Sequence, residues 1–379
     1  MRILVVNIGS TSLKYRLLQM PEGTELAEGR VERIGEAGGD CPDYGAAVTR
    51  CRTEIVGPGR PLEHLYELNG VGFKAVHAGP MTGARVVNDQ VLAAMEEFAF
   101  LAPAHNPPYV AAMRAFRRLV PEVPLVALFE TAFFDQMKEA AVTYAVPRSW
   151  KTELGIRRYG FHGASHRAAS ERAQEILDRN DLRHISCHLG GSSSVAAIRS
   201  GVAVDCSFGM SPQSGLPHNN RTGDIDVFAV LHAMKRKGYS VDEVAEILST
   251  RSGLAGLSGG SGDVRDLSEA ATGGDARSQL ALDVFVEAIR RYIGAFLVGL
   301  GGLDVLSFSG GIGENSANVR AAVCAGLAGL GLELDPGANQ RAGTTLSASS
   351  GRVAILLIPA DEERIVARAT AETVAELAR

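Results

Sequence analysis

Short apolar runs alternate with polar, glycine-rich turns along this chain of 379 residues. The first run, 3–6, stops at a polar turn, 7–12, and residues 13–18 resume the apolar pattern, so the sequence predicts a β-hairpin. Similar runs predict strands at 72–77, 124–129, 184–189, 195–199, 202–206, 304–308 and 353–358. Helical spacing predicts helices at 91–102, 106–119, 166–179, 226–236, 241–250 and 276–300, and from 361 onward. Residues 24–70 give weak signals that we interpret as short strands and loops. The order of elements is typical of an α/β protein.

The turn at 7–12 has the composition of a phosphate-binding loop. Glycine allows close approach of the backbone, the hydroxyls of Ser10 and Ser12 donate hydrogen bonds, and Lys14 adds positive charge. Taken alone, the turn could equally be an ordinary hairpin. The segment 188–193 repeats its form, however: polar, apolar, Gly, small, hydroxyl, hydroxyl. Two such turns in separate halves of the chain predict a duplicated domain with two phosphate-facing hairpins.

Three further segments carry candidate chemistry. The strand at 304–308 leads into a glycine-rich turn, 309–315, and then a helix, an arrangement typical of anion and nucleotide sites. Residues 207–225 form a long polar loop, and long loops inside compact domains are usually functional or disordered. The acidic residues 361–363 open the last helix, where simple helix capping is the alternative explanation.

Composition narrows the function classes. Hydrophobic residues make up 46% of the chain and the formal net charge is −5, which indicates a globular protein without a nucleic-acid-binding surface as its main feature. The five cysteines lack CxxC spacing, so we expect free thiols in a reducing compartment. We find no signal peptide and no apolar run of membrane-spanning length. These features predict a cytoplasmic protein of two or three domains that does not associate with membranes.

Motifs in order along the chain resemble those of the acetate kinase family. They are VVNIGSTSLKY (5–15), VHAG (76–79), LAPAHNPP (101–108), FETAF (129–133), YGFHGASH (159–166), CHLGGSSS (187–194), RTGDID (221–226), SGGIGENS (309–316) and IPADEE (358–363). The resemblance implies two duplicated domains of the actin-like ATPase (ribonuclease H-like) type facing across a cleft. It places them at 1–134 plus 364–379, and at 135–363, the second binding nucleotide. It also implies a homodimer joined through the second domain.

The same resemblance implies a reaction and its residues. A carboxylate and ATP would give an acyl phosphate and ADP, reversibly, with Mg²⁺ or Mn²⁺. Arg221 would steady the transferring phosphoryl group and His162 would hydrogen-bond it, whereas a surface arginine and a buried structural histidine are the alternatives. Asn7 and Glu362 would place the metal. The other nucleotide and phosphate residues would be Ser10, Ser12, Lys14, His188, Gly190, Gly191, Asp263, Arg265, Gly310, Gly311, Ile312 and Gly313.

The chain departs from the family pattern on the acid-binding side. Lys74 stands where the family has an arginine that grips the substrate carboxylate, and Arg85 is a second candidate for that task. Glu130 replaces a catalytic aspartate. Gly191-Ser192 replaces Asn-Gly in the second phosphate turn, so an amide contact is lost.

The acyl pocket would be lined by Val76, Phe161 and Pro212, with Ala104 in place of a leucine. Each methylene buried in the space thus opened is worth roughly 0.8 kcal/mol. We therefore expect propionate, butyrate or a branched acid to serve at least as well as acetate.

Two other functions stay open at this point. The departures could mark a catalytically weakened homologue that acts as a nucleotide-binding or regulatory protein. The chain could also be a phosphoanhydride phosphatase of the same fold. Pyrophosphate remains an alternative donor, although the intact glycine turn at 309–315 favours a nucleotide.

Overall fold

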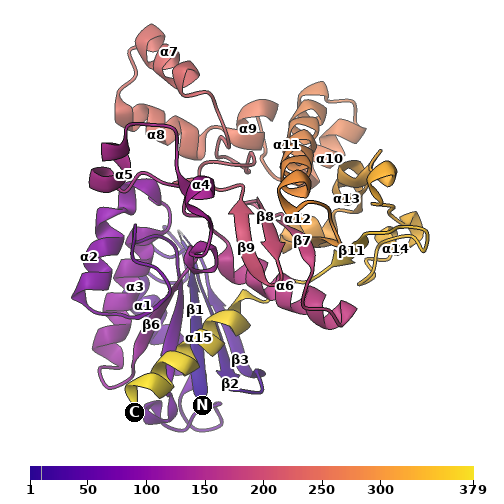
Figure 1. The fold of residues 1–379 in the computed structure, drawn as a ribbon. Coiled ribbons are helices and arrows are strands. Elements are labelled where there is room, and N and C mark those ends of the chain that lie inside the picture. Colours follow the sequence, from indigo (N-terminus) through magenta and orange to yellow (C-terminus); the bar gives the residue numbers. More distant parts are fainter. Residues whose placement is uncertain (10) are drawn as a thin grey trace. The chain divides into compact units, whose positions relative to one another are not determined.

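The computed structural model describes residues 1–9 and 11–379, so the expected phosphate-binding residue Ser10 lies outside the described residues. The chain divides into two compact units (Figure 1). Unit 1 comprises Met1–Asp135 and Asp361–Arg379, and unit 2 comprises Gln136–Ala360.

Unit 1 is built on a six-stranded mixed sheet with the order β3-β2-β1-β4-β6-β5. The strands are β1 (Arg2–Ile8), β2 (Leu13–Gln19), β3 (Thr24–Val31), β4 (Gly70–Ala75), β5 (Ala84–Val86) and β6 (Leu125–Phe129). Strands β1 and β2 pair in antiparallel register, with Asn7 opposite Lys14, so the predicted hairpin is confirmed. Strands β4 and β6 extend the sheet in parallel with β1.

Helices cover both faces of this sheet. Successive side chains of β4 point to opposite faces, and Phe73 packs edge-on against Phe116 of α3 (Asn106–Leu119). The opposite face meets α15 (Glu362–Leu377), which contacts β4, β1 and β6. A β-carbon on Gly72 would lie 2.3 Å from Thr370 Oγ1, so the close approach of α15 requires glycine there.

Unit 2 repeats the strand order of unit 1. Its five-stranded sheet has the order β11-β10-β7-β8-β9, formed by β7 (Arg183–His188), β8 (Ser194–Arg199), β9 (Val202–Cys206), β10 (Val305–Ser309) and β11 (Ala354–Leu357). Strands β7, β8 and β9 are antiparallel, while β10 and β11 run parallel to β7. The hairpin between β7 and β8 thus holds the same place as that between β1 and β2, which is the duplication that the repeated turns predict.

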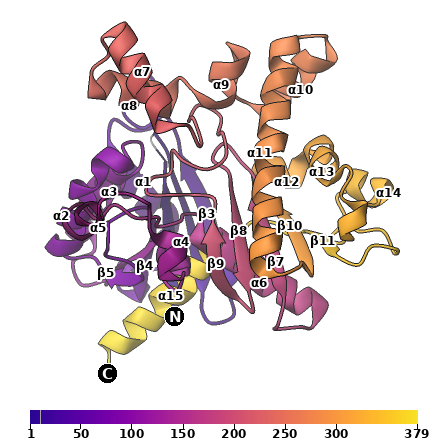
Figure 2. The same ribbon diagram turned by 45° about the horizontal axis from the view of Figure 1, so that its top comes forward.

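The long helix α11 (Ala276–Leu300) lies beside β8 (Figure 2). Its buried side chains recur every three or four residues, Phe285, Ile289 and Ile293 among them, and form one apolar stripe against the sheet. Helix α6 (Gly163–Leu177) contacts β7 and β10.

The remaining helices connect or flank these layers. They are α1 (Tyr44–Ile55), α2 (Asp89–Glu97), α4 (Glu139–Val142), α5 (Arg148–Leu154), α7 (Val227–Lys237), α8 (Val241–Thr250), α9 (Gly253–Ser258), α10 (Val264–Thr272), α12 (Gly310–Asn315), α13 (Ala317–Cys324) and α14 (Pro336–Gln340). Helix α1 differs from the loops and short strands expected for 24–70. Its buried stripe consists of Ala47, Val48, Cys51 and Ile55, whose small side chains give a weak periodic signal, while the Asp43 side chain caps its first turn. All five cysteines are free, as expected, and all five are buried.

Candidate active site

A buried charge cluster lies at the end of β4 in unit 1. Lys74, the penultimate residue of the strand, forms an ion pair with Glu362, the first residue of α15. The side chains are only 17% and 11% exposed, so the pair is largely shielded from water. Burial by itself would lower the pKa of Lys74, but the carboxylates of Glu362 and Glu130 more than offset this, and its pKa is raised. Lys74 is therefore a permanently charged ammonium among carboxylates.

Tyr109 links this cluster to the first hairpin. Its hydroxyl accepts a hydrogen bond from the Ile8 amide at 3.0 Å and donates to Asn7 Oδ1 at 3.2 Å. Burial raises the pKa of Tyr109, so the hydroxyl keeps its proton. Asn7, Lys74 and Glu362, three of the predicted site residues, thus belong to one region of unit 1.

The acidic residues at the start of α15 contact different partners. Arg16 contacts Asp361 at 3.3 Å and Glu363 at 3.8 Å, while Glu362 turns to Lys74. Asp361 occupies the N-cap position but its side chain makes no capping hydrogen bond. Helix capping alone does not explain the acidic residues 361–363. Glu362 differs from its two neighbours because it pairs with Lys74 and not with Arg16.

Glu130 follows β6 and is buried, with its amide donating to the Ala75 carbonyl at 2.8 Å. Arg85, the second candidate for the carboxylate, is exposed, and its Nε donates to the Thr82 carbonyl at 2.8 Å. Lys74, and not Arg85, is therefore the basic residue beside Glu362 and Glu130. Ser12 and Lys14 lie at and just after the hairpin turn, where the Ser12 carbonyl accepts from the Gly9 amide at 2.8 Å.

The residues predicted to line an acyl pocket come from both units. Val76 is buried and Ala104 exposed in unit 1, while Phe161 and Pro212 are buried in unit 2. Neither unit alone holds this predicted set.

Unit 2 brings two predicted histidines together. The rings of His162 and His188 have centroids 4.4 Å apart. His162 Nδ1 hydrogen-bonds Ser194 Oγ at 2.9 Å, and His188 Nδ1 hydrogen-bonds Ser165 Oγ at 2.7 Å. His162 also has a φ of 60° at the start of α6. This left-handed backbone is unfavourable for a side chain larger than glycine and is common where function demands a fixed geometry.

Arg221 lies in the predicted polar loop and is held from inside it. Its Nη1 donates to the Pro212 carbonyl at 2.7 Å, and burial lowers its pKa to about 10, so it stays charged at neutral pH. His218 stacks on Phe208, which also contacts the rings of His162 and Phe161. The Ser193 amide donates to His218 Nδ1 at 3.0 Å, which connects the Arg221 loop to the second phosphate turn.

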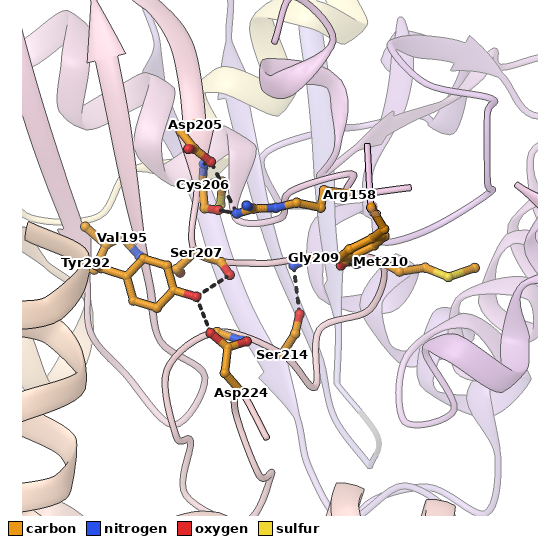
Figure 3. Close-up of polar contacts among 12 residues, drawn as sticks. Arg158, Val195, Asp205, Cys206, Ser207, Gly209, Met210, Ser214, Asp224 and Tyr292 are labelled. Carbon is orange, nitrogen blue, oxygen red and sulfur yellow. Dashed lines mark hydrogen bonds and ion pairs between the residues drawn. The ribbon is translucent and has the colours of Figure 1, made fainter. Parts of the chain in front are cut away.

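A set of side-chain contacts fixes the loop that carries Arg221 (Figure 3). Tyr292 of α11 donates a hydrogen bond to Asp224 and also reaches the Ser207 carbonyl at 3.3 Å. Asp224 Oδ1 in turn accepts from the Gly215 amide at 2.8 Å. Ser214 Oγ accepts from the Gly209 amide at 2.7 Å. The loop is therefore anchored to a rigid helix on the side of Asp224.

Arg158 secures the start of the same loop. It donates to the Cys206 carbonyl and forms an ion pair with Asp205 at 3.2 Å (Figure 3). Both acceptors belong to β9, from which the loop leaves. The ordered contacts at both ends are typical of a functional loop rather than a disordered one.

A cavity of about 680 Å³ in unit 2 gathers six of the twelve predicted nucleotide and phosphate residues. The predicted residues in its wall are Gly190, Gly191, Asp263, Arg265, Gly311 and Ile312. Asp263 caps α10, and the hydrogen bonds that it accepts from Arg265 hold its pKa below the usual range. A volume of this size is ordinary for a site that binds a small molecule or cofactor.

The glycine turn after β10 differs from the simple anion site that its sequence suggests. Gly310 has a φ of 75°, and a β-carbon there would lie 2.7 Å from the Leu189 carbonyl oxygen. Its amide donates to Glu314 Oε1 at 3.0 Å, and the same oxygen accepts from the Ala360 amide. The Gly310 amide is thus engaged within the protein, while Gly313 is buried inside the short helix α12. Gly311, Ile312 and Asn315 are the members of this turn that line the cavity.

Sequence reasoning missed Tyr109, His218, Asn219 and Tyr292, which hold or line these regions. None stands in a local motif that distinguishes it from a structural residue. The length of the polar loop is the signal that could have drawn attention to His218 and Asn219.

Comparisons with known proteins agree over nearly the whole chain. A sequence model of the Acetokinase family matches residues 2–368. An acetate kinase of Shouchella clausii (strain KSM-K16) is 41% identical over 389 residues, covering 97% of this chain and 98% of that protein. A propionate kinase of Citrobacter rodentium (strain ICC168) is 41% identical over 385 residues, covering 97% and 95%.

Solved structures give the same result. The acetate kinase of Porphyromonas gingivalis has a TM-score of 0.88 at 35% identity and covers 99% of both chains. A propionate kinase from Francisella tularensis subsp. tularensis SCHU S4 has a TM-score of 0.90 at 30% identity, with 98% of this chain and 99% of that one covered.

Proposed function

The chain belongs to the Acetokinase family, and on that premise we propose how this carboxylate kinase binds its substrates and which acid it prefers. The enzyme transfers a phosphoryl group between ATP and a carboxylate. A role as a regulatory homologue or a phosphatase is not favoured, because relatives about 40% identical over nearly the full chain are named as acetate and propionate kinases.

Arg221 and His162 are the groups we assign to the transferring phosphoryl. A carboxylate oxygen of the acid attacks the γ-phosphorus of ATP, and the bond from that phosphorus to the bridging oxygen of ADP breaks. Negative charge spreads over the phosphoryl oxygens during this step, and catalysis consists mainly of positioning and charge stabilisation. The planar guanidinium of Arg221 is held by the Pro212 carbonyl, so it meets this charge with little reorganisation. His162 contributes a hydrogen bond from a ring that Ser194 orients.

Lys74 is the group we assign to the substrate carboxylate. Its ammonium is charged, buried and surrounded by oxygen acceptors, whereas Arg85 is exposed and bonded to Thr82. A lysine offers a point charge and not the two-pronged contact of arginine, so the acid would be held less rigidly. Glu130 would position the reacting end of the acid through Lys74.

The residues present fit a magnesium ion. Two buried carboxylates, Glu362 and Glu130, flank the single ammonium of Lys74, which formally leaves one excess negative charge. Among the described residues, no group of three or more His, Cys, Asp or Glu side chains could hold a metal without help. Mg²⁺ commonly takes one or two carboxylates together with substrate phosphates and water. Glu362 and Asn7 would hold Mg²⁺ or Mn²⁺, which supplies charge neutralisation to the phosphates.

The cavity in unit 2 is our proposed nucleotide site. Gly190 and Gly191 would admit the phosphates, and Gly311 and Ile312 would contact the adenosine, with Asp263 and Arg265 completing the wall. His188 would add a hydrogen bond from the second hairpin, and Ser12 and Lys14 would serve the phosphates from the first.

Ala104 is the residue on which the proposed acid preference depends. We expect propionate or butyrate to be used at least as well as acetate, because alanine leaves space that a leucine would fill. Replacing Ala104 by leucine should lower kcat/KM for butyrate by about tenfold, since more than one buried methylene is displaced, and should leave acetate nearly unaffected. Steady-state rates with acids of two to five carbons measure this. A steep preference of the unaltered enzyme for acetate would contradict it.

The direct test of the reaction is an acyl-phosphate assay. Purified enzyme with ATP, Mg²⁺ and each of acetate, propionate and butyrate should yield a product that hydroxylamine traps as the hydroxamate. The Arg221→Ala variant should lower that yield by at least about a hundredfold, as expected when a transition-state cation is removed. Product at the level of this variant, or phosphate release without any acid, would reject the assignment.

We further propose a homodimer joined through unit 2 and a cytoplasmic location. Helix α7 contains no buried residue, and its large apolar side chains Val227, Phe228 and Leu231 are 50–74% exposed. Large apolar side chains gathered on one element often mark a protein–protein interface. No helix in the described part of the chain is long and apolar enough to cross a bilayer.

A further inference from the structure

The second phosphate turn is shaped to receive a side chain from the Arg221 loop. A β-carbon on Gly191 would lie 3.3 Å from Nδ2 of Asn219 and 3.7 Å from its Cγ. The first contact is tighter than usual for a β-carbon, and the second is an ordinary van der Waals contact. The glycine at position 191 therefore leaves room that the amide of Asn219 occupies.

The backbone of Asn219 is fixed on both sides. Its amide donates to the Gly191 carbonyl at 3.1 Å, and its carbonyl accepts from the Ala255 amide at 2.8 Å. The flanking carbonyls of His218 and Asn220 accept from Leu254 and Ser252 at 2.8 and 3.0 Å. Three consecutive residues are thus tied to the start of α9, and the side chain of Asn219 is held in place without any bond of its own.

The side-chain amide is not used by the protein. Asn219 Oδ1 is buried and has no hydrogen-bond partner, and no side-chain hydrogen bond of Asn219 occurs among the described residues. The Oδ1 atom is an acceptor, whereas the Nδ2 group of the same amide is a donor that makes no hydrogen bond with the described residues. Asn219 lies in the wall of the 680 Å³ cavity, next to Gly190, Gly191 and Gly311. The geometry therefore leaves the Nδ2 donor available to a ligand in that cavity.

We propose that Asn219 binds the phosphate chain of the nucleotide through its side-chain amide. The amide takes over the contact that the Asn-Gly form of the turn would make from position 191. An amide NH₂ group donates hydrogen bonds and phosphate oxygens accept them, so the chemistry matches. Asn219 lies on the same loop as Arg221, and the contact therefore couples nucleotide binding to the placement of the arginine. This inference rests on the proposed nucleotide site in unit 2.

The test measures binding separately from catalysis. Dissociation constants for ATP, ADP and adenosine are determined by calorimetry for the unaltered enzyme and for Asn219→Ala. The variant should weaken ATP and ADP by about tenfold, as the loss of a charge-assisted hydrogen bond predicts, and should leave adenosine unchanged. Asn220→Ala, a change at the exposed neighbour, is the matched control and should bind all three as the unaltered enzyme does.

A swap of the two residues guards against a purely structural effect. The double variant Gly191→Asn with Asn219→Gly moves the amide back to the turn and should recover most of the affinity for ATP. Gly191→Asn alone crowds the retained Asn219 and should weaken ATP. If Asn219→Ala fails to fold, Asn219→Asp keeps the size of the side chain and should weaken ATP more than adenosine.

The outcomes separate this inference from the proposed function. Equal affinity of Asn219→Ala and the unaltered enzyme for ATP would overturn the inference alone. An equal loss for adenosine would overturn the phosphate contact. Failure of the unaltered enzyme to bind ATP, or binding of ATP at a place outside this cavity, would overturn the nucleotide site itself.

Discussion

Lys74, the group that we propose for binding the substrate carboxylate, also carries a buried charge that should contribute to stability. Its ammonium is paired with Glu362 and lies near Glu130, all largely excluded from water. Replacing it by methionine keeps the shape but leaves the carboxylates without their cation. Removing one partner of a buried pair is costly, so we expect Lys74→Met to lower the free energy of unfolding by about 3 kcal/mol. Urea denaturation measures the change.

An exposed pair provides the control for this prediction. Arg30 pairs with Glu32 at the surface, where the side chains are 57% and 44% exposed. Arg30→Met should change the free energy of unfolding by less than about 1 kcal/mol, because water and salt screen such pairs. Equal effects of the two substitutions would mean that the Lys74 cluster is not a buried charge network.

Because His184 is buried, we expect the folded protein to lose stability in acid. The side chain is buried, its Nε2 hydrogen-bonds Ser307 Oγ at 2.7 Å, and burial lowers its pKa from 6.5 to about 3. Below pH 6.5 the unfolded chain binds a proton there that the folded protein does not, so stability falls as the pH drops toward 3. This one histidine contributes a slope of about 1.4 kcal/mol per pH unit in that range.

The pH dependence can be isolated with one substitution. His184→Asn removes the titrating group, so between pH 6 and pH 5 the variant should lose about 1.4 kcal/mol less stability than the unaltered protein. Parallel slopes for the His184 variant and the unaltered protein would contradict a buried neutral histidine.

At the scale of elements, we expect α11 to affect the reaction through Tyr292. The tyrosine hydroxyl bonds Asp224 and reaches the Ser207 carbonyl, and these contacts hold the loop that carries Arg221. Tyr292 is a positioning residue, because it touches no assigned substrate group. We expect Tyr292→Phe to lower kcat by about tenfold through misplacement of the arginine, with the KM for ATP nearly unchanged.

The split between kcat and KM distinguishes positioning from general destabilisation. Tyr66→Phe removes the hydroxyl of a tyrosine that is 79% exposed and should change neither parameter. A proportional rise in the KM for ATP in Tyr292→Phe, or an unaltered kcat, would argue against the role assigned to the Tyr292–Asp224 contact.

The elements also show which parts of the structure the sequence could predict. The two hairpins and helix α11 follow from local patterns: a short polar turn between apolar runs, and a single long stripe of apolar residues. Helix α1 does not, because its buried stripe includes Ala47 and Cys51, whose small side chains contribute little to the period. A helix of this kind is stabilised by its packing rather than by its pattern.

The site follows the same rule. The phosphate turns and Arg221 could be proposed because they stand in glycine-rich or polar motifs. The roles that we propose for Asn219 and Tyr292 depend on contacts with residues distant in sequence, Gly191 and Asp224. Tertiary contacts of this kind leave no periodic or compositional pattern in the sequence. From the sequence alone we therefore infer that the amide contact at position 191 is lost.

For the whole molecule, the proposed homodimer makes a prediction about mass. A dimer would have about twice the 40.0 kDa of one chain. Phe228→Asp, which places a charge in the exposed apolar patch of α7, should shift the protein to the monomer, because a carboxylate cannot be buried there without a partner. Light scattering coupled to size-exclusion chromatography measures the mass.

Phe100→Asp is the matched control for this prediction. Phe100 is also well exposed, at 62%, but it belongs to unit 1. It should leave the mass unaltered. A monomeric unaltered protein would reject the dimer, and a dimeric Phe228→Asp variant would reject α7 as its contact.

The path of the chain through unit 1 has a consequence for biosynthesis. Helix α15 covers the face of β4 at Gly72, yet the whole of unit 2 separates it from that strand in the sequence. A ribosome delivers unit 2 complete before it delivers this helix. Unit 1 therefore cannot complete its fold before unit 2 has been synthesised, although the N-terminal part of a protein usually folds first. Until α15 emerges, the nascent first sheet exposes an apolar surface, and that interval is when the polypeptide is most exposed to aggregation and most in need of a chaperone.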